Sequence, residues 1–177
     1  ALFPVYDLLK GKADINLVAI GAMHGEFEKT ETLRQISIEK IYGKDKLFAY
    51  LKEFNMNSNI GSCSGDATCL DKYLPTVYTK LGIDASKINS CMPTDGLTMY
   101  NAEVANSQKL GISGSPTLVI NGVESSAGRD SASYLAGICN AMTTPAAECS
   151  TQLSAVAPGP GFGYDSTGAA TAAGCGV

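Results

Sequence analysis

The chain has 177 residues with a formal net charge of −4; 45% of its residues are hydrophobic and 17% are charged. This length suits one domain with a tail, and the apolar content is enough to build a core. The negative net charge gives no electrostatic surface for nucleic acid, which needs a basic face. No apolar run is long enough to span a membrane, so we expect neither a nucleic-acid partner nor a membrane-spanning segment here.

Two elements are expected at the start of the chain. Residues 1–10 are typical of the later part of a helix, because Ala, Leu and Phe at its start do not cap helices. Residues 14–21 form an apolar run that is predicted to be a strand. This strand is apolar on both faces, which suits a position inside a covered sheet.

Four or five helices are expected next. Apolar residues recur at helical spacing, and Asp66, Asp84 and Thr94 or Asp95 are candidate N-caps. The expected helices cover residues 27–42, 44–54, 66–80, 84–92 and 94–110. Residues 55–65 are rich in Asn, Ser and Gly and are predicted to form a loop.

The segment Gly114-Ser115-Pro116-Thr117, followed by Leu118-Val119-Ile120-Asn121-Gly122, is the most informative stretch of the sequence. A proline has no backbone N–H to donate, so Pro116 belongs at the start of a strand. Asn-Gly supplies the two positive φ angles of a type I′ hairpin turn. A return strand over 123–126 and a helix over about 131–142, capped by Asp130 or Ser131, are expected to follow.

This order of proline, strand, hairpin, strand and helix is similar to the C-terminal half of the thioredoxin superfamily. The Ser-Pro-Thr sequence resembles the one found in its DsbA-like extracytoplasmic branch of thiol–disulfide oxidoreductases. The resemblance implies an α/β, thioredoxin-like fold over residues 1–142, with an inserted helical subdomain over about 27–110. It also implies a cis bond before Pro116, with Ser115, Pro116 and Thr117 contacting a thiol substrate.

The Cys-x-x-Cys pair through which such oxidoreductases act does not occur in this sequence. If Pro4 matches the proline that kinks the helix after that pair, the pair and the first strand would precede Ala1. The neighbouring strand over 14–21 would then need a partner strand, supplied by an upstream segment or by another protein. Alternatively, Pro4 occupies the first position of an ordinary helix.

The six cysteines are Cys63, Cys69, Cys91, Cys139, Cys149 and Cys175. No two of them have the close spacing of structural zinc sites, and His24 is the only histidine, so no metal and no cofactor are expected. Disulfides are favoured instead, and with them an oxidising compartment. Our first choices are Cys69–Cys91 and Cys139–Cys149, which leaves Cys63 and Cys175 free or joined to each other. Ser37, in an apolar helical stripe, is a position where a cysteine would fit.

Residues 143–177 form a Gly-, Ala- and Pro-rich tail with two cysteines, which is too poor in apolar residues to build a core. Two functions are compatible with the sequence. One is a DsbA-like oxidoreductase domain that acts on extracytoplasmic protein thiols and is seen without its Cys-x-x-Cys pair. The other is a redox-inactive structural or interaction subunit of an extracytoplasmic assembly, whose partner protein completes the sheet edge. In either case the location would be periplasmic, cell-surface or secreted.

Overall fold

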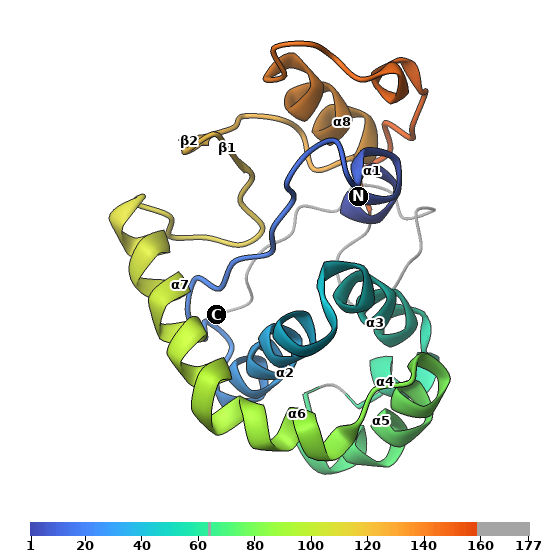
Figure 1. The fold of residues 1–177 in the computed structure, drawn as a ribbon, viewed down its shortest axis with the longest axis vertical. Helices are drawn as coiled ribbons and strands as arrows, with labels where there is room; N and C mark the ends of the chain where they lie inside the picture. The colour runs from blue at the N-terminus through green and yellow to red at the C-terminus, as the bar shows by residue number, and fades with distance from the viewer. Residues whose placement is uncertain (64, 159–177) are drawn as a thin grey trace. The chain divides into compact units, whose positions relative to one another are not determined.

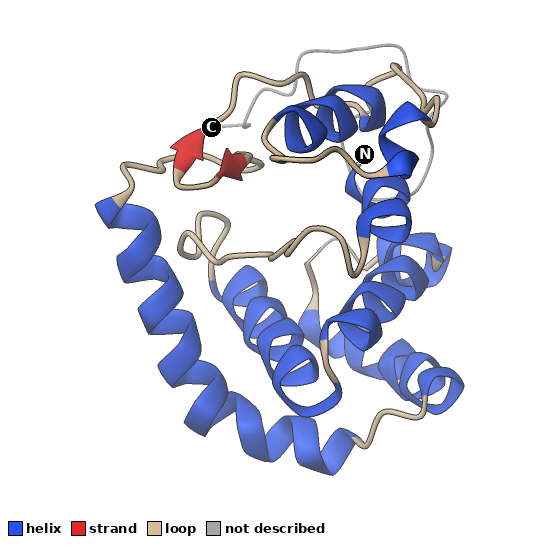
Figure 2. Cartoon of the chain, turned by 45° about the horizontal axis from the view of Figure 1, so that its top comes forward, coloured by secondary structure: helices blue, strands red, loops and turns tan. Residues whose placement is uncertain are grey.

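The structure, a computed structural model, describes residues 1–63 and 65–158 and is mostly helical (Figures 1 and 2). Helices hold 61% of the described residues and strands hold 3%. Within that part of the chain, the sheet consists of two antiparallel strands. The predicted thioredoxin-like α/β fold is therefore wrong, and the run over 14–21, which we expected to be a strand, carries no strand pairing.

The chain divides into two compact units and crosses between them twice. Unit 1 combines Ala1–Leu17 with the chain from Pro116 onward, and unit 2 is Val18–Ser115. Both the cysteine-rich middle of the chain and its long helices belong to unit 2.

The regular elements that the structure describes in unit 2 are all helical. They are α2 (Glu26–Tyr42), α3 (Lys44–Met56), α4 (Ser58–Gly61), α5 (Ala67–Leu81), α6 (Ala85–Cys91), the π-helical turn η1 (Met92–Gly96) and α7 (Leu97–Lys109). Four predicted helices are confirmed, and each of their predicted ends lies within two residues of the observed end; they were predicted over 27–42, 44–54, 66–80 and 84–92. The predicted loop over 55–65 contains the short helix α4, which the sequence pattern did not indicate.

The helix boundaries follow from local capping chemistry. The Asp66 carboxylate accepts hydrogen bonds from the backbone N–H groups at the start of α5, and Asp84 does the same for α6. Gly82 ends α5 in the left-handed conformation, at φ 64°, which glycine adopts without a steric penalty. Pro75 lies inside α5 and is exposed.

The predicted break before Thr94 does not occur. Instead, α6 continues through η1 into α7 (Figure 1). Gly96, at the end of η1, makes a close approach to α2, because a Cβ atom there would lie 2.8 Å from Ser37 Oγ. This glycine allows the two helices to meet where Ser37 is fully buried.

Two groups of apolar side chains fill unit 2. Ala19, Ile36 and Tyr100 form a small cluster between α2 and α7, and partly buried Leu33, Leu97, Met99 and Val104 pack against it. A second set lies on α3 and α5, where the buried side chains are Leu47, Phe48, Tyr50, Phe54, Leu70, Leu74, Val77 and Tyr78. Burying such side chains supplies most of the stabilisation of a helical unit.

Unit 1 contains α1 (Leu2–Leu9), β1 (Val119–Ile120), β2 (Val123–Glu124), α8 (Ser131–Asn140) and the 3-10 turn η2 (Ala147–Ser150). Helices α1 and α8 pack together. The predicted hairpin is confirmed, since Asn121 at φ 50° and Gly122 at φ 82° have the positive angles of a type I′ turn. Asp130 caps α8 as expected, and Pro4 lies in the first turn of α1, where its missing N–H breaks no intrahelical bond.

Candidate functional site

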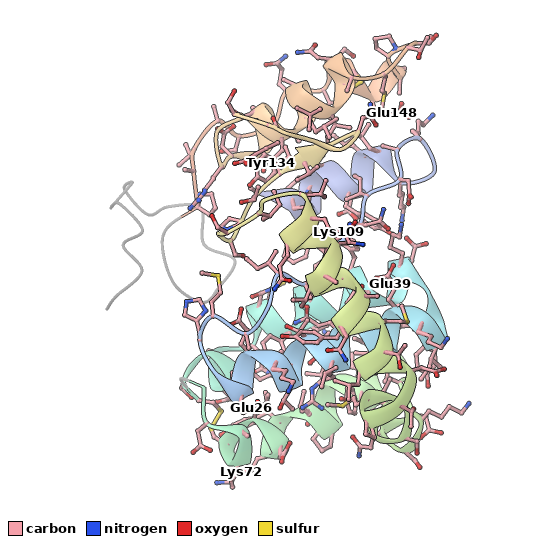
Figure 3. All side chains as sticks on the ribbon, turned by 90° about the vertical axis from the view of Figure 1, so that its left-hand side faces the viewer. Glu26, Glu39, Lys72, Lys109, Tyr134 and Glu148 are labelled. Atoms are coloured by element: carbon pink, nitrogen blue, oxygen red, sulfur yellow. A yellow bond between two sulfur atoms is a disulfide. The ribbon has the colours of Figure 1, made fainter. Side chains whose placement is uncertain are left out.

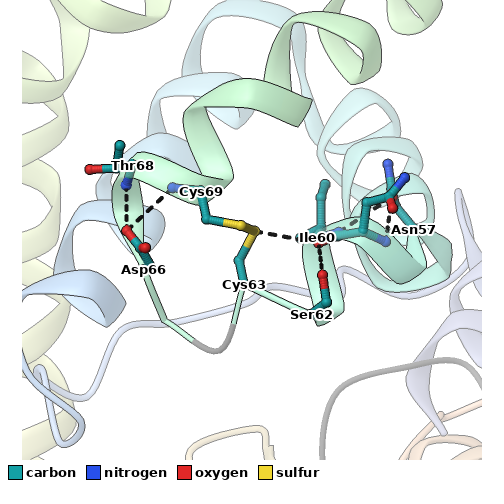
Figure 4. The surroundings of a disulfide bond; sticks show 8 residues. Asn57, Ile60, Ser62, Cys63, Asp66, Thr68 and Cys69 are labelled. Carbon is teal, nitrogen blue, oxygen red and sulfur yellow. Dashed lines mark hydrogen bonds between the residues drawn. A yellow bond between two sulfur atoms is a disulfide. The ribbon is translucent and has the colours of Figure 1, made fainter.

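The disulfide Cys63–Cys69 joins the residues just after α4 to the first turn of α5 (Figure 4). The two Cα atoms are 5.4 Å apart, within the usual range for a disulfide. The predicted pair Cys69–Cys91 is therefore wrong. The expectation that Cys63 is free or joined to Cys175 is also wrong, since Cys63, predicted to lie in a loop, follows α4 and is bonded to Cys69.

Polar groups surround this bridge on both sides (Figure 4). Asp66 Oδ1 accepts hydrogen bonds from the backbone N–H groups of Thr68 at 2.8 Å and Cys69 at 3.2 Å. Cys63 Sγ lies 3.4 Å from the carbonyl oxygen of Asn59. Cys63 is buried and Cys69 is partly exposed, so one half of the bridge is accessible from solvent.

The second disulfide, Cys139–Cys149, confirms the predicted pair and joins α8 to η2, with a Cα–Cα distance of 5.9 Å. Cys139 is buried on α8. Next to the bridge, Lys12 Nζ forms an ion pair with Glu148 Oε1 at 3.2 Å. The bridge and this ion pair attach η2 to the helical part of unit 1.

Cys91, at the end of α6, is the free cysteine of the described residues and is partly exposed. Cys175 lies outside the described residues. Ser37 is fully buried and donates a hydrogen bond to the Leu33 carbonyl oxygen at 2.7 Å, so its hydroxyl is satisfied within α2.

The predicted substrate-contacting residues Ser115, Pro116 and Thr117 lie just before β1. Ser115 and Pro116 are exposed, and the chain crosses from unit 2 to unit 1 between them. The cis bond and the contact with a thiol substrate stay predictions.

A buried polar cluster between α2, α3 and α5 was missed by the sequence reasoning. Arg34 Nε donates to Glu31 Oε2 at 2.9 Å, and Arg34 Nη1 donates to the Tyr78 hydroxyl at 2.9 Å. Glu31 Oε1 accepts from the Tyr50 hydroxyl at 2.9 Å and from Gln35 Nε2 at 3.2 Å. The i, i+3 spacing of Glu31 and Arg34 was the available signal, but at a helix surface that spacing is commonplace.

Burial changes the acidity of every charged or phenolic member of this cluster. It raises the pKa of Glu31 above its ordinary value, while the Arg34 guanidinium acts in the opposite direction. Burial lowers the pKa of Arg34, the Glu31 carboxylate raises it, and the net shift is upward. Burial and the Glu31 charge hold the pKa of Tyr50 well above its usual range. The cluster therefore holds a matched ion pair with satisfied hydrogen bonds, as buried charges require.

Two side chains of helix α7, one turn apart, form hydrogen bonds with the backbone of Ala19. Lys109 marks the C-terminal end of this helix in Figure 3. Glu103 Oε2 accepts from the Ala19 N–H at 2.8 Å, and Ser107 Oγ donates to the Ala19 carbonyl oxygen at 3.0 Å. Burial raises the pKa of Glu103, the Ala19 N–H opposes this, and the charge of Glu39 adds to it.

Metal and membrane sites are not indicated in the part of the chain that the structure describes. It contains no group of three His, Cys, Asp or Glu residues that could hold a metal ion. None of its helices combines the length and the apolar character needed to cross a bilayer. No protein-family model matches this chain, and neither the curated proteins nor the solved structures include a match.

Proposed function

We propose that this chain is a disulfide-stabilised interaction subunit of an extracytoplasmic assembly, and that it does not catalyse thiol–disulfide exchange. The observation that carries the proposal is the placement of its two bridges. Each joins a helix to a nearby segment, over sequence separations of 6 and 10 residues, and each has one buried half. Bridges of this kind stabilise small domains in oxidising compartments.

The surroundings of Cys69 support the absence of catalysis. A catalytic thiol needs a lowered pKa, which opposite charges or a helix N-terminus provide. Cys69 has the helix N-terminus, but the Asp66 carboxylate lies within the same turn and accepts from the Cys69 N–H at 3.2 Å. A negative charge so close opposes formation of a thiolate.

The interaction part of the proposal is supported by the hairpin of unit 1. Both residues of β2 are exposed, and Val123 exposes 70% of its surface. An exposed strand edge is a template for pairing with a strand of another protein. The chemistry expected of a partner is thus an extended segment with apolar side chains at alternate positions.

The thiol–disulfide oxidoreductase remains the second candidate, because Cys69 lies in the first turn of a long helix, where a thiolate is favoured. A turnover assay separates the two functions. We expect that the purified chain does not accelerate the reduction of insulin by dithiothreitol beyond the rate without protein. A clear acceleration that is lost in a Cys69→Ser variant but kept in Cys91→Ser would overturn the proposal in favour of the second candidate.

A further inference from the structure

Backbone hydrogen bonds that do not involve the sulfur atoms lie on both sides of Cys63–Cys69. At α4, Asn57 Oδ1 accepts from the N–H groups of Asn59 and Ile60, and at α5 Asp66 is the cap. The Cys63 N–H donates to the Ile60 carbonyl at 3.0 Å, and the Asp66 N–H donates to the Cys63 carbonyl at 2.9 Å. Because every one of these bonds is independent of the bridge, opening it does not remove a helix cap.

Both sulfur atoms also have a suitable environment in the reduced state. Cys63 Sγ already lies 3.4 Å from the Asn59 carbonyl oxygen, which can accept the S–H of a reduced thiol. As a thiolate, Cys69 in the first turn of α5 gains the favourable field of the helix N-terminus, which the Asp66 carboxylate in the same turn partly offsets. Contacts that stabilise the reduced form make a disulfide easier to reduce.

From this geometry we propose that Cys63–Cys69 is a reversible redox switch, which a dithiol reductant opens while α4 and α5 stay folded. The inference goes beyond the proposed function and does not depend on it. The second bridge differs, because η2 has no side-chain cap hydrogen bond, and Cys139–Cys149 joins it directly to α8. We therefore expect Cys63–Cys69 to open first.

The exchange proceeds at the accessible half of the bridge. A thiolate of the dithiol attacks Cys69 Sγ, the bond between the two cysteines breaks, and Cys63 leaves as a thiolate that takes up a proton. The second thiol of the reductant then attacks the reductant's other sulfur atom, which is bonded to Cys69 in the mixed disulfide, and releases Cys69. The bridge gains two electrons and two protons, and the dithiol becomes a disulfide. The product is a partly exposed Cys69 thiol, whose thiolate can attack a disulfide of a partner, forming a mixed disulfide and releasing the partner's second sulfur as a thiol.

A redox titration of the full chain tests this inference. Free thiols are first blocked in the native protein, which is then equilibrated in buffers of increasing ratio of reduced to oxidised dithiothreitol. After acid quenching, a second alkylating reagent and peptide mass spectrometry measure the reduced fraction of each bridge. We expect the Cys63–Cys69 pair to open at a less reducing ratio than Cys139–Cys149, with an unchanged helical circular dichroism signal. Opening of both bridges together, opening of Cys139–Cys149 first, or loss of helicity when Cys63–Cys69 opens would each overturn it.

A matched pair of helix-cap variants tests how the charge of Asp66 affects reduction of the Cys63–Cys69 bridge. Asp66→Asn keeps a good N-cap but removes the charge beside Cys69, whereas Asp84→Asn makes the same change at α6, away from the bridge. At about pH 9, above the ordinary cysteine pKa of about 8.5, we expect Asp66→Asn to raise the reduced-to-oxidised ratio of Cys63–Cys69 about threefold. An unchanged ratio in Asp66→Asn, or an equal rise in Asp84→Asn, contradicts the switch as described. Unlike the insulin assay, this titration measures an equilibrium, so either proposal can fail while the other stands.

Discussion

The Glu103 carboxylate accepts a hydrogen bond from the backbone N–H of Ala19 at 2.8 Å, although 84 residues separate the two in sequence. With Ser107 Oγ donating to the Ala19 carbonyl, helix α7 satisfies both polar backbone groups of this residue. A neighbouring strand would normally do so. This is why an apolar run with a strand-like sequence does not need a strand partner at Ala19.

Glu103→Gln is expected to raise the free energy of unfolding at pH 7 by roughly 0.5 kcal/mol, because solvent screens part of the effect at this half-buried carboxylate. Burial raises the pKa of Glu103 in the folded chain, so ionisation favours the unfolded state, and wild-type stability falls as the pH rises from the unfolded pKa through the folded one. The amide keeps an acceptor for Ala19 without a buried charge. Urea unfolding should show this gain at pH 7 and its disappearance at about pH 4, below the unfolded pKa of about 4.3. A less stable variant at pH 7 would mean that the charged hydrogen bond outweighs burial.

Arg34→Met is expected to lower the free energy of unfolding by about 3–5 kcal/mol, because Glu31 is left buried without its counter-charge. Part of that loss should return as the pH falls, since protonation removes the unmatched charge. Chemical denaturation at several pH values measures both effects. Tyr50→Phe removes one hydrogen bond of Glu31 but no charge, and should cost about 1 kcal/mol. Equal losses in the two variants would contradict a central role for the ion pair.

Removing the second bridge with Cys139→Ala and Cys149→Ala is expected to cost about 3 kcal/mol, the chain-entropy value for a loop of this size. Thermal unfolding under non-reducing conditions measures the loss. Cys91→Ser is the matched control, since Cys91 forms no bridge. If the double variant is as stable as Cys91→Ser, the attachment of η2 does not depend on the bridge.

Pro75→Ala is expected to stabilise the chain by about 2–2.6 kcal/mol. An interior proline costs about 3 kcal/mol in a helix, and its stiffening of the unfolded chain returns about 0.4–1 kcal/mol. Pro75 is exposed within α5, so its replacement leaves the packing unchanged. Thr76→Ala, at the adjacent exposed position, should change stability by about 0.5 kcal/mol or less. A destabilised Pro75→Ala variant would show that α5 requires the bend that a proline introduces.

Local chemistry made part of this structure predictable. The caps at Asp66, Asp84 and Asp130 and the turn at Asn121-Gly122 depend on residues within a few positions, and the structure has them as expected. The Gly-Ser-Pro-Thr segment likewise predicted the hairpin beside it but not the sheet around it, because strand pairing is decided by distant residues.

The candidate site was predicted less well than the elements. The periodicity that located α2 counts apolar residues, so Glu31 and Arg34, which are buried as a pair, gave no sign of facing inward. Cysteine spacing indicated the Cys139–Cys149 bridge, since α8 and the segment after it are neighbours in sequence. For Cys63 it left a free thiol or a bridge to Cys175, and not the observed bridge to Cys69, because α4 was not recognised in a stretch rich in Asn, Ser and Gly.

Disulfide mapping of the native chain is the most direct test of the central claim, that this is a helical protein with two local bridges. The chain is alkylated without reduction, digested and analysed by mass spectrometry. We predict peptides linked through Cys63–Cys69 and Cys139–Cys149, with Cys91 alkylated. Alkylation of all four bridge cysteines, or a Cys69–Cys91 link, would contradict both the bridges and the oxidising location inferred from them.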